Sequence, residues 1–143
     1  MPAFTDAVHS TKRFRLGTRR QVNGNEFIYL KGVASTTAAS WVFFDADGTT
    51  TLTVANSKGR VAVAMAPTVA NTFGWYQIYG KASGKVVTGA NNAKVWVTAT
   101  AGSVDNTDVA VDLVAGAIQR SATASNLATF ELNYPVCLNE VYN

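Results

Sequence analysis

Few residues in this sequence are of the types that build catalytic centres. Among its 143 residues there is one histidine, His9, and one cysteine, Cys137. A single histidine in a polar N-terminal segment leaves few ways to build a Ser-His, Cys-His or His-metal site. Because no second cysteine is present for a disulfide, Cys137 is expected to be a small buried or interface side chain. We therefore expect no enzymatic activity, no metal and no cofactor.

Two short segments begin like ligand-binding loops but lack the rest of each motif. Asp45-Ala46-Asp47-Gly48 opens like a calcium loop, yet no carboxylate follows at the closing position. The spacing of Gly80 and Gly84 lacks the Lys-Ser/Thr ending and the following helix of a phosphate-binding loop. We expect a hairpin turn at the first segment, and at the second a strand that bends or lets another backbone approach closely.

A basic segment near the N-terminus is the clearest candidate for a binding surface. On a strand, Arg13, Arg15 and Arg19 would share one exposed face, since side chains alternate between the faces. Arginine matches phosphate geometry, so nucleic acid is one possible partner, but such a face is more often solvated or in contact with protein. Nucleic acid is therefore the less favoured partner. The residues expected to contact an acidic protein surface are Arg13, Phe14, Arg15, Arg19 and Arg20.

Charge is unevenly distributed along the chain, whose formal net charge is +3. Residues 1–31 hold six Lys or Arg against two acidic residues, whereas residues 95–143 hold one against five. A basic front and an acidic back permit head-to-tail attraction between copies, or docking of the front on an acidic partner.

The dominant pattern is alternation of apolar and polar residues, which predicts half-buried strands rather than helices. The length fits one domain. We expect an all-β fold, a small β-barrel or β-sandwich with about nine or ten strands. The expected strands are 12–22, 27–33, 41–45, 49–55, 60–66, 75–79, 94–100, 109–113, 117–123 and 127–133.

Turn and breaker residues divide the chain further. Asn23-Gly24 is typical of a tight hairpin turn, and Pro67 favours a short helical turn over 67–73. We expect an extended N-terminal arm at 1–11, a β domain at 12–133 and a C-terminal tail at 134–143 that is an arm rather than a strand.

Aromatic residues on the expected strands are open to two interpretations. They could stack nucleic-acid bases, as in an oligonucleotide-binding barrel. Packing in the core or at a subunit interface is the more common role of strand aromatics. The residues expected to pack in this way are Trp75, Tyr76, Tyr79 and Trp96.

No feature of the sequence points to a membrane. No apolar run approaches the ~18 residues that would cross a bilayer, and the N-terminus lacks the pattern of a signal peptide. A lone cysteine is simplest to explain by folding in a reducing cytoplasm.

Several segments together resemble small virion proteins of tailed bacteriophages, in particular the head decoration, or capsid cement, type. The resemblance covers about residues 13–130. It lies in the order and general residue character of the segments, and Gly-Trp-Tyr-Gln-Ile-Tyr-Gly is its most specific piece. The segments are Arg13-x-Arg15-x-Gly17-Thr18, Lys31-Gly-Val-Ala-Ser35, Val61-Ala-Val-Ala-Met-Ala66 and Gly74-Trp-Tyr-Gln-Ile-Tyr-Gly-Lys-Ala82.

The resemblance implies a non-enzymatic protein on the outer surface of a capsid, made in the host cytoplasm. It would bind the major capsid protein, self-associate as a homotrimer and clamp neighbouring capsid subunits. The alternatives are a nucleic-acid- or glycan-binding β-barrel and another head or tail component of a phage.

Overall fold

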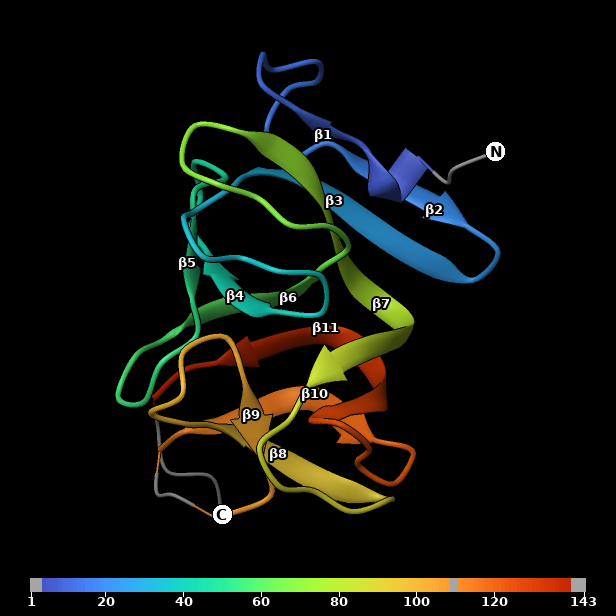
Figure 1. Ribbon diagram of the computed structural model, residues 1–143, viewed down its shortest axis with the longest axis vertical. Helices are drawn as coiled ribbons and strands as arrows, with labels where there is room; N and C mark the ends of the chain where they lie inside the picture. Colours follow the sequence, from blue (N-terminus) through green and yellow to red (C-terminus); the bar gives the residue numbers. More distant parts are fainter. Residues whose placement is uncertain (1–3, 109–110, 140–143) are drawn as a thin grey trace.

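The computed structural model describes residues 4–108 and 111–139, and in these ranges it contains strands and one short 3-10 helix, η1 (Figure 1). The all-β class is therefore confirmed. The elements are η1 Phe4–Asp6, β1 Val8–His9, β2 Arg19–Val22, β3 Asn25–Lys31, β4 Trp41–Phe44, β5 Thr50–Leu52, β6 Gly59–Ala64, β7 Phe73–Lys85, β8 Ala93–Val97, β9 Val104–Asp105, β10 Leu113–Gln119 and β11 Leu127–Cys137.

All these strands belong to one antiparallel sheet with the order β2-β3-β7-β6-β11-β10-β8-β9. In addition, β4 pairs with β6 and β5, β1 pairs with β7, and β7 also pairs with β11. Over the described residues the two end strands of this order, β2 and β9, do not pair with each other, so a closed barrel, one of the two expected architectures, does not form. The sheet instead folds back on itself, with β1–β3 at one end and β8–β11 at the other (Figure 1).

The pair β4–β6 is buried on both faces and lies between two apolar clusters. On one face Trp41 and Val63 join the cluster formed with β10 and β11. On the other face Val42 and Ala62 join the cluster formed with β3 and the first half of β7. Double burial explains why β4 is a continuous apolar run rather than an alternating one.

The long strand β7 connects the two ends of the molecule because it changes partners at a bend. Up to Tyr79 it pairs with β3, and from Tyr79 to Lys85 it pairs with β11. The register of β7 against β3 shifts between Gln77 and Tyr79, and the next residue, Gly80, has a φ of +99° that favours glycine. The strand therefore runs past its expected end at residue 79. The bend lies at Gly80, in the segment where the glycines predicted a bend.

The N-terminal region differs from the expected arm and strand. Residues 4–9 lie on the sheet, where η1 and β1 pack against β7. The expected strand over 12–22 is wrong for most of its length, because only Arg19–Val22 pairs with β3. Residues 12–18 form an irregular loop, in which Gly17 (φ +91°) makes a tight turn closed by a hydrogen bond from Thr18 N–H to the Arg15 carbonyl.

Three other expected elements are also wrong. No helical turn forms over 67–73; Thr68 bridges to Thr36, and Phe73 already belongs to β7. Val111 (φ +69°) and Asp112 are not in a strand, and β10 takes the place of the two strands expected at 109–113 and 117–123. Residues 109 and 110 lie outside the described residues.

The C-terminal tail expected from residue 134 is a strand as far as Cys137, whose partner in β6 is Gly59. Asn23 (φ +53°) and Gly24 (φ +83°) form the expected hairpin turn between β2 and β3.

Candidate functional site: a basic loop on an aromatic cluster

An aromatic cluster covers the outer face of β3 and β7. Its buried members are Phe27, Tyr29 and Trp75. The ring of Phe4 stands edge-on to both Phe27 and Trp75, at centroid distances of 5.5 and 5.2 Å. Phe14 stands edge-on to Tyr29 at 5.2 Å. This cluster is the surface on which the N-terminal residues rest.

The basic loop, residues 12–18, is held on this cluster by both ends of Tyr29. Backbone N–H of Gly17 donates to the Tyr29 carbonyl (2.8 Å), and Tyr29 N–H donates to the Thr18 carbonyl (2.9 Å). The phenol oxygen accepts a hydrogen bond from Arg13 N–H (3.2 Å) and lies 2.8 Å from His9 Nδ1, to which its own proton can be donated. His9 is thus a structural partner of Tyr29.

Basic and apolar residues alternate in the loop although the loop does not pair with a strand. Leu16 packs inward on the aromatic cluster, while Arg13 and Arg15 are exposed. Phe14 contacts the cluster on one side yet is 43% exposed. Among the described residues, Arg13 and Arg15 form no ion pair. The tip of the loop is therefore an exposed aromatic ring between two uncompensated guanidinium groups.

The other two arginines of the predicted contact surface lie elsewhere. Arg20 stacks over the ring of Phe4, with its Cζ 4.2 Å from the centroid. Arg19, one residue earlier on β2, points to the opposite face and lies 3.5 Å from a carboxylate oxygen of Glu26. The expectation that Arg13, Arg15 and Arg19 share one face is therefore wrong.

Glu26 is the buried centre of a polar network that sequence reasoning missed. Its Oε1 accepts hydrogen bonds from Gln21 Nε2 (2.9 Å) and from the phenol of Tyr134 (2.7 Å). Burial raises the pKa of Glu26, but these two hydrogen bonds and the charge of Arg19 together outweigh it, so the net pKa lies below 4.5. The hairpin turn at residues 23–24 was a usable signal, because it places Gln21 opposite Glu26.

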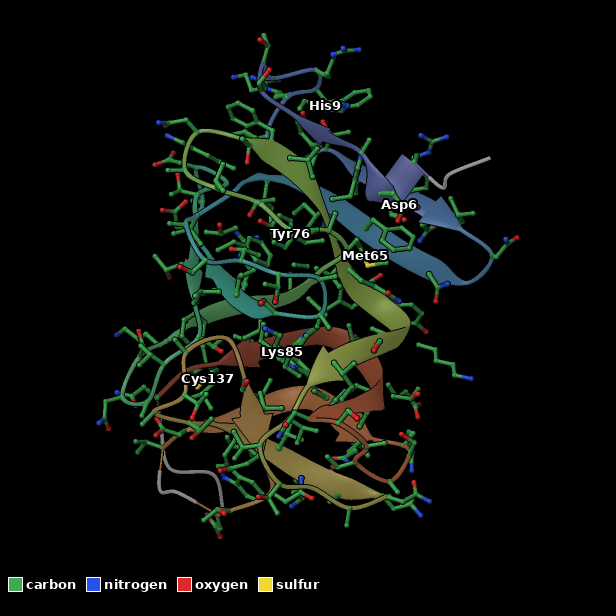
Figure 2. All side chains as sticks on the ribbon, viewed as in Figure 1. Asp6, His9, Met65, Tyr76, Lys85 and Cys137 are labelled. Carbon is green, nitrogen blue, oxygen red and sulfur yellow. The ribbon has the colours of Figure 1, made fainter. Side chains whose placement is uncertain are left out.

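The four aromatic residues expected to pack in a core or interface have different environments. Trp75 and Tyr76 are buried in the core, and Figure 2 shows Tyr76 in the interior between the layers. Trp96 is half-buried on β8, and Tyr79 is 40% exposed. Tyr79 is therefore available at the surface.

Asp45 and Cys137, which the sequence singled out, have structural roles. Asp45 Oδ1 accepts hydrogen bonds from the backbone of Asp47 and Thr49, as the expected hairpin turn requires. Cys137 is fully buried in the lower part of Figure 2, and burial raises the pKa of its thiol. Within residues 4–108 and 111–139, no three His, Cys, Asp or Glu side chains gather as metal ligands. The same ranges hold no helix long and apolar enough to cross a membrane.

Comparisons with protein-family models, with curated proteins and with solved structures give no match for this chain.

Proposed function

We propose that this protein is a structural component of a tailed-phage virion, which decorates the capsid and binds the major capsid protein through its basic loop. The observation that carries the proposal is the tip Arg13-Phe14-Arg15, which is exposed, anchored at its base by Tyr29 and without an acidic partner among the described residues. The resemblance of the sequence to decoration proteins supports the choice of a tailed-phage virion as the particle.

The composition of the tip favours a protein partner over nucleic acid. Aromatic side chains and arginine are enriched at the centres of protein interfaces. Nucleic-acid binding depends on neutralising many phosphates. Of the four arginines, Arg19 is already paired with Glu26 on the opposite face and Arg20 is stacked on Phe4, so they do not extend the charge of Arg13 and Arg15 into a longer phosphate-binding surface.

The charge distribution supports self-association. Among the described residues, 4–31 hold six Lys or Arg against two acidic residues and lie at one end of the molecule, whereas 95–108 and 111–139 hold four acidic residues against one arginine and lie toward the other end (Figure 1). Contacts between unlike ends are heterologous, and such contacts close into a ring when the rotation between copies is right. We propose a homotrimer, the state that the resemblance implies. A ring bound across capsid subunits stabilises the assembled shell by mass action, because it binds the assembled form and not separated subunits.

The test is occupancy on shells assembled from the major capsid protein of the same phage. The double variant Arg13→Glu/Arg15→Glu is compared with Lys58→Glu/Lys94→Glu, which makes the same change of net charge at exposed positions elsewhere. We expect the first variant to lose at least tenfold in affinity and the second to bind like the wild type. Equal losses in both variants, or no binding of the wild type to shells, would contradict the proposal.

Nucleic acid is tested with the same variants. We expect no appreciable binding of the free protein to duplex DNA at physiological salt. A micromolar, salt-sensitive affinity that Arg13→Glu/Arg15→Glu abolishes would assign the loop to nucleic acid instead.

A further inference from the structure

A pair of exposed tyrosines lies on the face opposite the aromatic cluster, at the bend of β7. Tyr79 and Tyr134 are 40% and 46% exposed, with ring centroids 5.2 Å apart and planes inclined by 36°. They come together because Tyr79 is paired with Asn133, the residue before Tyr134, where β7 passes from β3 to β11. Two large rings that lie side by side and are each partly exposed form an aromatic surface open to solvent.

Tyr134 is held by its backbone and by its phenol, and Tyr79 packs against it. Tyr134 has a φ of +48°, a conformation that a bulky residue adopts rarely and at an energetic cost. Tyr79 lies between the register shift at Gln77–Tyr79 and Gly80, which has a φ of +99°. The Tyr134 phenol is also tied to buried Glu26 by a hydrogen bond of 2.7 Å. The pair is therefore held in place before any ligand arrives, which lowers the entropic cost of binding.

A hollow of about 310 Å³ opens beside Tyr79. Apart from Tyr79 it is lined by the β2–β3 hairpin, namely Gln21, Val22, Asn23, Gly24 and Asn25. The volume lies at the lower end of the range for small-molecule sites. Its polar groups are side-chain amides, which can both donate and accept hydrogen bonds. Asn25 is held in position, since its Oδ1 accepts from Lys81 N–H (3.2 Å) and Gln77 Nε2 (3.3 Å).

No charged residue lines the hollow, and the charges beside the tyrosine pair compensate each other. Arg19 lies 3.5 Å from Glu26, and its Cζ is 6.0 Å from the centre of the Tyr134 ring. The hollow thus presents aromatic faces and neutral amides rather than a net charge. A neutral sugar fits this chemistry, because the C–H face of a pyranose packs on an aromatic ring while its hydroxyls bond to amides. A phosphate or sulfate would need a free cation.

We infer that the hollow beside Tyr79 and Tyr134 binds a neutral saccharide of one or two pyranose rings. Tyr79, which lines the hollow, supplies the apolar face, and Tyr134 packs beside Tyr79 outside the lining and extends that face. The amides of Gln21, Asn23 and Asn25 bond the hydroxyl groups. This site goes beyond the proposed capsid role and does not depend on it, since the basic loop and the tyrosine pair share no residue.

The experiment is an NMR titration of the full chain with methyl glucoside, methyl galactoside, N-acetylglucosamine, maltose and cellobiose. We expect at least one of these sugars to shift amide signals of residues 21–25 and 79–80. Tyr79→Ala and Tyr134→Ala are each expected to weaken that affinity at least tenfold. Tyr79→Ala leaves the hydrogen bond between Tyr134 and Glu26 in place, and the signals of the buried core report whether each variant is folded.

The control is Phe14→Ala, which removes an exposed aromatic ring from the other face and is expected to leave sugar affinity unchanged. Absence of shifts with every sugar, or equal affinity in folded Tyr79→Ala, would overturn the inference. So would tighter binding of a single-stranded oligonucleotide at the same residues, because it would show that the rings stack bases.

Discussion

The phenol of Tyr134 donates a 2.7 Å hydrogen bond to the buried carboxylate of Glu26, 108 residues earlier in the chain. This contact joins β11, near the C-terminal end of the described chain, to the first hairpin. It fixes an exposed aromatic ring and compensates a buried charge in one interaction.

The first prediction concerns this network and pH. The folded pKa of Glu26 lies below 4.5, so the carboxylate stabilises the fold above its unfolded pKa, and this contribution is lost as the pH falls through the folded value. Glu26→Gln should lower the free energy of unfolding at pH 7 by about 1–3 kcal/mol. Urea unfolding of both proteins at pH 7 and pH 3 measures the effect of the substitution and the effect of pH on the free energy of unfolding. If the free energy of unfolding falls between pH 7 and pH 3 by the same amount in Glu26→Gln as in the wild type, this role of Glu26 is contradicted.

The second prediction concerns the approach of β7 to the core. A Cβ at Gly84 would lie 2.9 Å from both Phe130 Cδ1 and Trp41 Nε1, and this nitrogen donates a 2.9 Å hydrogen bond to the Lys85 carbonyl. Gly84→Ala should therefore destabilise the fold by about 1–3 kcal/mol through overpacking. Ser83→Ala, exposed on the same strand, is the control and should change the melting temperature little. Equal melting temperatures for the two variants would contradict the prediction, because they would show that Phe130 and Trp41 move to accommodate the added methyl group.

The third prediction concerns the anchor of the basic loop. Tyr29→Phe removes only the hydroxyl that contacts Arg13 N–H and His9 Nδ1. We expect a loss of about 0.5–1.5 kcal/mol and faster trypsin cleavage after Arg13 and Arg15 under native conditions. Mass spectrometry of the first fragments gives the sites. If cleavage in the loop is as slow as in the wild type, the phenol does not restrain it.

The fourth prediction concerns Cys137. Because the side chain is fully buried and burial raises the pKa of the thiol, little thiolate is exposed to a reagent. A disulfide reagent at pH 8 should label the folded protein at least a hundredfold more slowly than the protein in urea. Rapid labelling of the folded protein would mean that the end of β11 opens readily.

The fifth prediction concerns assembly. If unlike ends attract each other, sedimentation should show a trimer at low salt and smaller species at 1 M salt, where exposed charges are screened within about 3 Å. Arg13→Glu/Arg15→Glu should shift the equilibrium in the same direction. A monomer under all conditions would contradict the homotrimer.

Local patterns were enough to predict the fold class and several elements. Alternation predicted strands because side chains alternate between the faces of a strand, and Asn23-Gly24 predicted a hairpin because both residues adopt positive φ easily. The hairpin also places Gln21 opposite Glu26, a signal for the polar network that the sequence analysis did not use.

The alternating pattern led to the wrong prediction of a strand at residues 12–18, which form a loop. An inward Leu16 between outward Arg13 and Arg15 is the same pattern whether the chain pairs with a strand or lies on an aromatic cluster. Hydrogen bonds to Tyr29 decide between the two, and they depend on contacts with residues distant in the sequence.

The sequence by itself determined the β class, the first hairpin, the bend at Gly80 and the charge difference between the ends, because each depends on neighbouring residues or on composition. Only the tertiary structure decided that β11 continues past Asn133 and that Tyr134 lies beside Tyr79 and bonds to Glu26. The physical reason is that strand pairing over long separations is set by how the whole sheet folds to bury its apolar faces. No local pattern around residue 134 contains that information.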